Sequence, residues 1–403
     1  MNKKLIYNGK IVSPFTTIKN GFIVLSGKKI GFIGSEDADK EVLEHEMSGT
    51  GRKFDANGNT LVPGLIDIHT HGVLGKDYSS SPDLVFEDSP FRASKGVTAF
   101  LPTVGCFTST EKAAASAEKL SEYVTRPMPG ARPLGINMEG PFLHPELGAQ
   151  DKSNCLGCVD LDYLEQLLNS AKGMIKIMTI SPELPGAMEG IRCLKSNGII
   201  PAVGHTLAED KVLDEAVRAG ARLVTHLFNT TYQPEQDVKG VIKPGVNEYL
   251  LIRDDIMAEF ICDSSGTHIH PVMLEVLLRC KTVANLIMIS DSFLSPGLEE
   301  NIPIHMPDGR TMVMRNGVNY QDPSGHITGS AMTLDRSVRS LMQFTSTDLS
   351  DALLMASCNP AKLLGIEASK GSLEPGKDGD IVMVDDDFTI LKTFVEGDLV
   401  YEQ

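Results

Sequence analysis

The sequence lacks any apolar run of the length that a membrane-spanning helix needs, about 18 uninterrupted apolar residues. It also lacks the pattern of a signal peptide, because Met1-Asn-Lys-Lys leads directly into a short predicted strand. We find no internal repeat and no low-complexity segment. These absences predict a globular protein that neither crosses nor binds a membrane.

Basic residues and cysteines are also scarce. Lys and Arg number 37 against 53 Asp and Glu, which gives a net charge of −16. Nucleic acid is therefore not an expected partner, because a phosphate backbone needs a basic face. The 7 cysteines are an odd number scattered along the chain, which is typical of a reduced, cytoplasmic protein. Cys155 and Cys158 form a close pair, but no second pair completes a zinc ribbon, so we interpret both as loop residues.

The segment that carries the most information is residues 61–71, an apolar run that ends on His69 and His71. In an extended strand, residues i and i+2 point to the same side. The two imidazoles therefore converge at the carboxyl end of this strand, as two ligands of one cation must. The pair alone fits two ordinary surface histidines equally well, so the interpretation depends on the rest of the chain.

Other apolar segments end in the same way on an ionisable side chain. They are residues 133–139 with Glu139, 199–205 with His205, 221–226 with His226, and 285–291 with Asp291. Three further apolar runs carry no obvious ligand at their ends: 96–103, 174–181 and 256–263. Helical patterns separate most of these segments, at 111–124, 161–171, 188–196, 207–219 and 271–280.

Short apolar runs that alternate with helices indicate parallel β/α units, and eight of them predict a closed (β/α)8 TIM-type barrel of the α/β class. In such a barrel the catalytic groups lie at the carboxyl ends of the strands. Every candidate ligand found above lies at such an end. The length of 403 residues fits one barrel with a smaller attached unit.

The two ends of the chain predict that smaller unit. Residues 1–60 and 371–403 both show alternating apolar residues bounded by Asn-Gly and Pro-Gly turns. We expect them to form one small β-sandwich, with the barrel at 61–370 inserted between them. Residues 302–328 contain two further turns, at 307–309 and 315–317, and predict a hairpin excursion over the barrel mouth.

Eight motifs stand in one order along the chain, at 63–72, 138–142, 203–206, 225–229, 266–271, 290–292, 328–333 and 357–361. Together they resemble the N-acetylglucosamine-6-phosphate deacetylases of the amidohydrolase superfamily, nearly from end to end. The resemblance implies an amidohydrolase-type barrel with a terminal β-sandwich. It also implies a homodimer that acts on a small-molecule substrate in the cytoplasm.

Amide hydrolysis at neutral pH needs an activated water and a polarised carbonyl, and a divalent metal can supply both. Glu139, His205 and His226 form a catalytic set of two histidines and one carboxylate, and the resemblance assigns the same three to the metal. His69 and His71 allow a second ion. We therefore expect one or two divalent ions, with zinc first and iron, manganese, cobalt or nickel as alternatives.

Asp291 is the candidate general acid/base. It would take a proton from the attacking water and pass it to the leaving amine. The alternative is an Asp that only caps the helix after the eighth strand.

The resemblance places the substrate on residues Ala149, Gln150, Asn229, Thr230, His268, Ile327, Thr328, Gly329 and Ser330. This set departs from the family in two ways. Gln150 stands where the family has histidine, and it can form hydrogen bonds but carry no charge. The arginine that the family places after Asn229 for the phosphate is missing.

Lys239 or Lys243 could supply the missing charge, without the bidentate grip of a guanidinium. We hypothesise that one of them, with His268 and backbone N–H groups around Asn229 and Thr230, holds a 6-phosphate. The sequence thus predicts hydrolysis of the N-acetyl group of an amino sugar 6-phosphate, such as N-acetylglucosamine 6-phosphate. The alternatives are an amidohydrolase for another amide, cyclic amide or acylated amine, and a non-catalytic sugar-phosphate binding protein.

Overall fold

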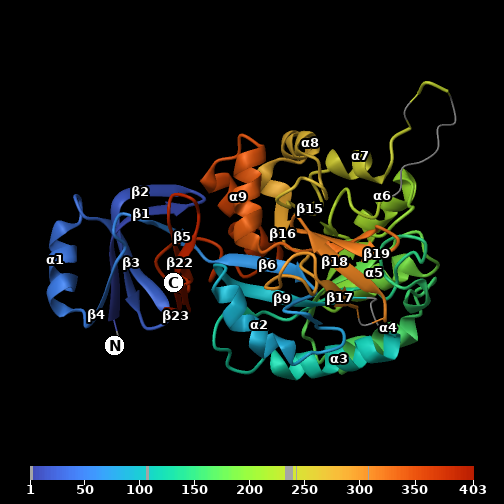
Figure 1. Ribbon diagram of the computed structural model, residues 1–403, viewed down its shortest axis with the longest axis horizontal. Helices are drawn as coiled ribbons and strands as arrows, with labels where there is room; N and C mark the ends of the chain where they lie inside the picture. The colour runs from blue at the N-terminus through green and yellow to red at the C-terminus, as the bar shows by residue number, and fades with distance from the viewer. Residues whose placement is uncertain (1–2, 106–108, 232–238, 242, 307) are drawn as a thin grey trace.

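The computed structural model describes residues 3–105, 109–231, 239–241, 243–306 and 308–403. Its strands fall mainly into two large sheets, which lie at opposite ends of the view in Figure 1. Both termini belong to the smaller unit on the left, and the middle of the chain forms the larger unit on the right. The chain therefore leaves the terminal sheet, builds the larger unit and returns.

Eight parallel strands form the larger unit, and each lies beside the next in chain order. They are β6 (Leu65–Thr70), β9 (Val97–Gly105), β11 (Ile136–Glu139), β12 (Ile175–Ile180), β13 (Ile200–Val203), β14 (Leu223–Val224), β15 (Met257–Ile261) and β16 (Leu286–Ile289). The short β10 (Arg132–Pro133) adds to β9. Strands buried on both faces read as continuous apolar runs, which is why these segments were recognisable in the sequence. The N–H of Asp291 donates to the His69 carbonyl at 3.0 Å, so the last strand returns to the first and the barrel is nearly closed.

Helices connect these strands and cover the barrel (Figure 1). They are α2 (Leu84–Ala93), α3 (Thr110–Tyr123), α4 (Leu161–Ser170), α5 (Ala187–Ser196), α6 (Asp210–Ala219), α7 (Val246–Leu251), α8 (Pro271–Lys281) and α9 (Leu334–Phe344). α10 (Leu349–Leu353), the π-helical turn η3 (Leu354–Cys358) and α11 (Asn359–Leu363) follow. α4 shows how the sequence sets a boundary, because the Asp160 side chain accepts from the Tyr163 N–H at 3.0 Å and caps the helix. Leu164 and Leu167 on one side of α4 are then buried.

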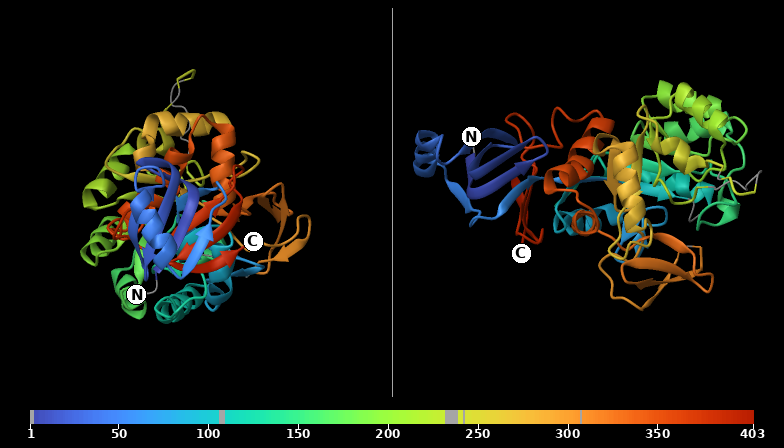
Figure 2. Two further views of the ribbon diagram at one scale, coloured as in Figure 1. Left: turned by 90° about the vertical axis from the view of Figure 1, so that its left-hand side faces the viewer. Right: turned by 90° about the horizontal axis from the view of Figure 1, so that it is seen from above.

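The terminal unit is one mixed sheet of eight strands drawn from both ends of the chain (Figure 2). From one edge the order is β23 (Asp398–Glu402), β22 (Ile390–Val395), β21 (Ile381–Val384), β5 (Thr60–Pro63), β1 (Lys3–Ser13), β2 (Thr16–Ser26) and β3 (Lys29–Ser35), with β4 (Arg52–Asp55) beside β1. α1 (Lys40–Gly49) lies between β3 and β4 in the chain. Ile6, Ile23, Ile381 and Phe394 share one apolar cluster, so the two ends of the chain stabilise each other. The predicted β unit built from both termini is confirmed, although its strands are hydrogen-bonded into one sheet.

A third sheet follows β16 in the chain, and Figure 2 shows that it lies to one side of the barrel. It consists of β17 (Pro303–His305), β18 (Thr311–Arg315), β19 (Val318–Asp322) and β20 (Ile327–Ser330). The turn at Asn316 and Gly317 joins β18 to β19 as the sequence predicted, whereas Pro307 of the other predicted turn lies outside the described residues. We call β17–β20 the hairpin sheet.

Candidate metal centre and active site

Glu139, His205 and His226 meet at the carboxyl ends of β11, β13 and β14. Glu139 Oε1 lies 3.0 Å from His205 Nε2 and 2.8 Å from His226 Nε2, and the two ring nitrogens are 3.2 Å apart. Two imidazole nitrogens on one tetrahedral ion, each at about 2.0–2.1 Å, would be separated by about 3.3–3.4 Å. This group therefore has the donor chemistry and the spacing of a metal site.

His69, His71 and Asp291 form a second buried group of the same kind. The His69 and His71 Nε2 atoms are again 3.2 Å apart, and Asp291 Oδ1 lies 3.6 and 3.4 Å from them. Glu139 connects the two groups, because its Oε2 lies 3.1 Å from His71 Nε2 while its Oε1 faces the first group. The residues present fit two neighbouring ions with Glu139 between them.

Local backbone conformation turns several of these side chains into the site. His205, His226 and Asp291 have φ values of 47°, 27° and 46°, in a region that residues other than glycine rarely adopt. Each of them directly or closely follows a buried barrel strand. Such strained positions persist only where the surrounding structure fixes them, and they are enriched at functional sites.

Glu259 supports the site from the interior of β15. Its Oε2 lies 2.9 Å from His69 Nδ1, and both side chains are fully buried. A carboxylate on Nδ1 orients the ring and leaves Nε2 as the atom that faces a metal. Sequence reasoning missed this residue because Glu259 lies within an apolar run and not at its end.

The electrostatics of the site favour a cation. Burial alone would lower the pKa of His71, yet Asp291 and Glu139 raise it to about 10. Burial alone would also raise the pKa of Glu139, yet His205 and His226 hold it well below its usual range. Carboxylates that stabilise positive charge on imidazoles will also stabilise a metal ion that replaces the protons.

A cavity of about 330 Å³ opens over the two groups of ligands. Besides metal-site residues, its walls include these residues predicted to bind substrate: Ala149, Gln150, Asn229, Thr230, His268, Ile327 and Gly329. The volume lies in the range of small-molecule sites, roughly 300–1,000 Å³. The structure thus gathers most of the predicted site around one cavity at the carboxyl ends of the strands.

Four of the residues predicted to bind substrate are not among those that line this cavity. Thr328 and Ser330 are buried within β20, where the Ser330 hydroxyl donates to the Ser290 carbonyl. Lys243 lines a different cavity and lies 4.0 Å from Glu209 Oε1, and Lys239 is exposed. Among the described lining residues no Lys or Arg faces the catalytic cavity. Neither Lys239 nor Lys243 is therefore among the described residues that line this cavity, and their role toward a phosphate stays a prediction.

Two supporting residues were also missed in the sequence. Asp263 Oδ2 lies 2.9 Å from His268 Nδ1, and it fixes that ring against the cavity. Burial would raise the pKa of Asp263, yet His268 and Ser265 lower it, so the carboxylate stays ionised. Gln321 Nε2 donates to the Ala149 carbonyl at 2.7 Å and ties the hairpin sheet to the loop that carries Gln150. The bond between Gln321 and Ala149 joins segments 172 residues apart, and no local pattern signals it.

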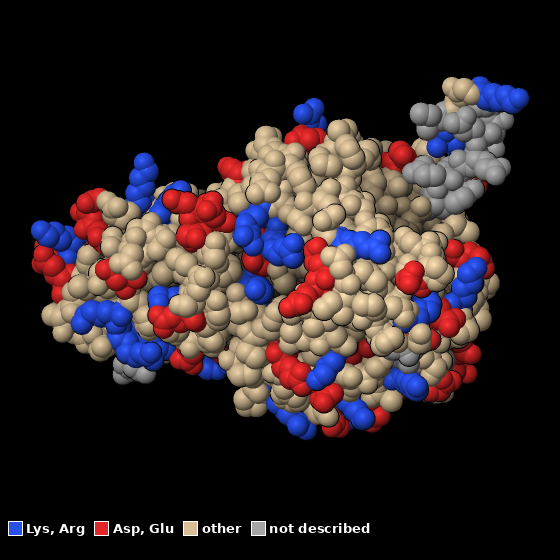
Figure 3. All heavy atoms as spheres, in the orientation of Figure 1, with Lys and Arg blue, Asp and Glu red and all other residues tan. Residues whose placement is uncertain are grey.

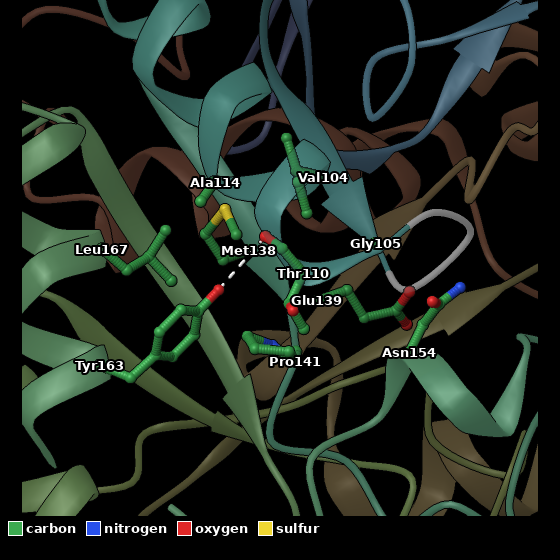
Figure 4. A pocket seen from close by; sticks show the side chains of 12 residues that line it. Val104, Gly105, Thr110, Ala114, Met138, Glu139, Pro141, Asn154, Tyr163 and Leu167 are labelled. Atoms are coloured by element: carbon green, nitrogen blue, oxygen red, sulfur yellow. Dashed lines mark hydrogen bonds between the residues drawn. The ribbon is translucent and has the colours of Figure 1, made fainter. Parts of the chain in front are cut away.

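A smaller cavity lies behind β11 and is not a ligand site. Its volume is about 10 Å³, which is no more than one water molecule needs. Figure 4 shows Glu139 extending away from the apolar side chains of Met138, Tyr163 and Leu167 that pack there. The Tyr163 hydroxyl donates to the Thr110 carbonyl at 3.2 Å, which joins α4 to the start of α3 (Figure 4). This packing fixes the base of the strand that carries Glu139.

Acidic and basic side chains are interspersed on the face shown in Figure 3, without a continuous basic patch. In the part of the chain that the structure describes, no helix has both the length and the apolarity to span a bilayer.

The barrel with two buried groups of His and carboxylate ligands at its mouth defines the class of protein: a metal-binding hydrolase of the (β/α)8 type. The sequence profile of the Amidohydrolase family matches residues 60–400. The chain is 30% identical to the N-acetylglucosamine-6-phosphate deacetylase of Bacillus subtilis (strain 168), over 98% of this chain and 97% of the relative. It is 29% identical to the Homo sapiens protein of the same name, over 100% of this chain and 95% of the relative.

The crystal structure of N-acetylglucosamine-6-phosphate deacetylase from Pasteurella multocida superposes with a TM-score of 0.87 at 25% identity, covering 100% of both chains. The chain belongs to the amidohydrolase family and, within it, to the N-acetylglucosamine-6-phosphate deacetylase family.

Proposed function

We propose that the protein hydrolyses the N-acetyl group of an amino sugar 6-phosphate, N-acetylglucosamine 6-phosphate or a close relative. The observation that carries this proposal is the pair of ligand groups that share Glu139 beneath one cavity of about 330 Å³. A barrel fold alone does not decide the reaction. Membership of the amidohydrolase family supports an amide as the substrate.

The metal site consists of Glu139, His205 and His226, with His69, His71 and Asp291 for a second ion. A divalent ion bound there supplies Lewis-acid chemistry: it polarises the amide carbonyl and lowers the pKa of water. Zinc suits this mixture of imidazole and carboxylate ligands, and iron, manganese, cobalt or nickel suit it as well.

Asp291 acts as the general acid/base. Burial would raise its pKa, yet His71 and His69 lower it, so the carboxylate is ionised and ready to accept a proton. It lines the catalytic cavity and faces the same imidazoles as Glu139. Asp291 takes a proton from the attacking water and delivers it to the amine as the C–N bond breaks, which yields acetate and the free amino sugar.

The cavity walls position the sugar. Asn229 Nδ2 donates to the His268 carbonyl at 3.2 Å, and His268 Nε2 lies 3.3 Å from the Gly329 carbonyl. These contacts hold two polar side chains of the wall in place. Gln150 lines the same cavity; its Nε2 already donates to the Leu147 carbonyl at 2.6 Å, whereas its Oε1 can accept from a hydroxyl group. We propose that His268, with backbone N–H groups near Thr230, faces the 6-phosphate.

A second candidate is an amide without a phosphate, and one observation favours it. No Lys or Arg among the described residues lines the catalytic cavity, whereas a dianion is usually held by a cation. The substrate would then be an unphosphorylated N-acyl amino sugar or another acylated amine.

One experiment separates the two candidates. Acetate release is measured with N-acetylglucosamine 6-phosphate, N-acetylgalactosamine 6-phosphate and their unphosphorylated forms, followed by other acylated amines. The first proposal predicts a kcat/KM at least roughly 100-fold higher for a phosphorylated sugar, which corresponds to about 2.7 kcal/mol. Equal values with and without phosphate would favour the second candidate.

A further inference from the structure

Beside the catalytic cavity lies a second, more open cavity of about 390 Å³. The two cavities share the lining residues Gly148, Ala149, Gln150 and His326, so they adjoin each other along this segment. The remaining walls come from the adjoining loop and from the hairpin sheet, and they include Arg310. The hairpin sheet therefore builds a chamber next to the catalytic centre that the proposed reaction does not use.

The chamber is rich in groups that bind hydroxyls. Ser324 and His326 are exposed in it, and the exposed residues Asp151 and Lys152 also line it. Hydroxyl, imidazole, carboxylate and ammonium groups together offer both donors and acceptors. A ligand with many hydroxyl groups, each both donor and acceptor, matches this mixture.

The charges of the chamber argue against a phosphate as its ligand. Arg310 donates through Nε to Asp308 Oδ2 at 2.9 Å, and its Nη2 also pairs with that carboxylate. Lys152 pairs with Glu146. Because each cation already has a carboxylate partner, the chamber offers little net positive charge for a dianion. It fits a neutral polar ligand better.

A chain of contacts connects the chamber to the metal site. Arg310 Nη1 donates to Gln321 Oε1 at 3.0 Å, and Gln321 Nε2 donates to the Ala149 carbonyl at 2.7 Å. The next residue, Gln150, has its amide nitrogen 3.3 Å from His205 Nδ1. The segment that lines both cavities is thus held by contacts on the side of the hairpin sheet and on the side of the metal site.

Gly148 shows how closely this wall lies against the centre. Its φ is +99°, and a Cβ there would lie 2.2 Å from Gln150 Oε1 and 2.7 Å from His205 Nδ1. Only glycine fits this position without displacing a metal-site residue. The loop is therefore a tightly packed rim that both cavities share.

We infer that this chamber is a subsite for a second, neutral sugar ring joined to the N-acetylated amino sugar. The substrate class would then include N-acetylated disaccharides or glycosides and not only monosaccharides. The inference rests on the proposed deacetylation, and it concerns what lies beyond the acetylated ring.

The test compares acetate release from N-acetylglucosamine 6-phosphate with release from a disaccharide that carries the same phosphorylated ring, and repeats the pair without phosphate. The subsite predicts a KM for the disaccharide at least roughly 10-fold below that of its monosaccharide, or about 1.4 kcal/mol. Ser324→Tyr, which fills the chamber, should abolish this advantage and leave the monosaccharide KM unchanged. Ser80→Tyr, on a loop at a different cavity, serves as the matched control.

Equal kcat/KM values for disaccharide and monosaccharide in the wild-type protein would overturn the subsite and leave the proposed deacetylation intact. If no compound releases acetate, calorimetry of the metal-loaded protein with the same compounds decides the matter. Tighter binding of a disaccharide that Ser324→Tyr removes would support the subsite, and equal or absent binding would refute it.

Discussion

Replacement of Glu259 by Gln tests how the interior of the barrel prepares the metal site. The side chain keeps its shape, but the charge opposite His69 Nδ1, at 2.9 Å, is lost. His69 should then be a weaker metal ligand, because the carboxylate raises the basicity of the ring and fixes its orientation. The first group, Glu139 with His205 and His226, keeps all of its ligands.

The size of the effect follows from burial. Both Glu259 and His69 are fully buried, so no water can replace the lost carboxylate. Residues that hold a metal ligand in this way typically contribute about 10–100-fold in metal affinity, or about 1.4–2.7 kcal/mol. We expect this loss at the His69, His71 and Asp291 group and a much smaller loss at the other group.

Metal titration of the depleted protein, followed by calorimetry and by metal content per chain, measures the two affinities. Glu183→Gln is the matched control. Glu183 accepts hydrogen bonds from the Thr206 hydroxyl and from the Leu207 N–H beside the barrel mouth, and these two bonds involve none of the metal-ligand side chains. Unchanged metal affinity in Glu259→Gln would refute the reasoning. So would a loss confined to the Glu139 group.

Four further predictions follow from the same contacts. Asp291→Asn should lower kcat by roughly 100-fold or more while the Glu139 group keeps its metal, and a variant with wild-type turnover would exclude the acid/base role. Glu139→Ala should lower metal content at both groups, because its two oxygens face both, and full metal content in this variant would contradict the assignment. His69→Ala should remove at most one ion per chain, and loss of more than one would contradict the assignment. Lys243→Ala should leave the KM for phosphorylated sugars unchanged, since Lys243 lies outside the catalytic cavity, and a several-fold rise in KM would show the opposite. Arg92→Leu should lower the free energy of unfolding by about 3–5 kcal/mol in a urea titration, because it leaves buried Asp67 and Asp88 without their cation, whereas exposed Arg279→Leu should change it by less than about 1 kcal/mol.

The barrel and its metal ligands were predictable because the same short segments carry both signals. A strand buried on both faces is a continuous apolar run, and the ligand is the ionisable residue at which that run stops, as with His205 and Asp291. The terminal unit was predictable from its turn residues and from the alternation of apolar and polar residues along its strands. The order of its strands was not, since β5 pairs with β1 and β21 across long stretches of chain.

Contacts made through the fold could not be predicted. Glu259 stands in mid-strand, and only the barrel register directs it toward His69. Gln321 reaches Ala149 across 172 residues, and no local pattern indicates that bond. Charge and closeness in sequence to Asn229 predict Lys239 or Lys243 as a phosphate ligand, yet Lys243 lines another cavity.

The most direct test of the account is acetate release by the metal-depleted protein before and after a divalent ion is restored. With N-acetylglucosamine 6-phosphate as the first substrate, we expect no release without metal and full recovery when the Glu139, His205 and His226 group is filled. Undiminished acetate release by protein shown to be free of metal would contradict the central claim.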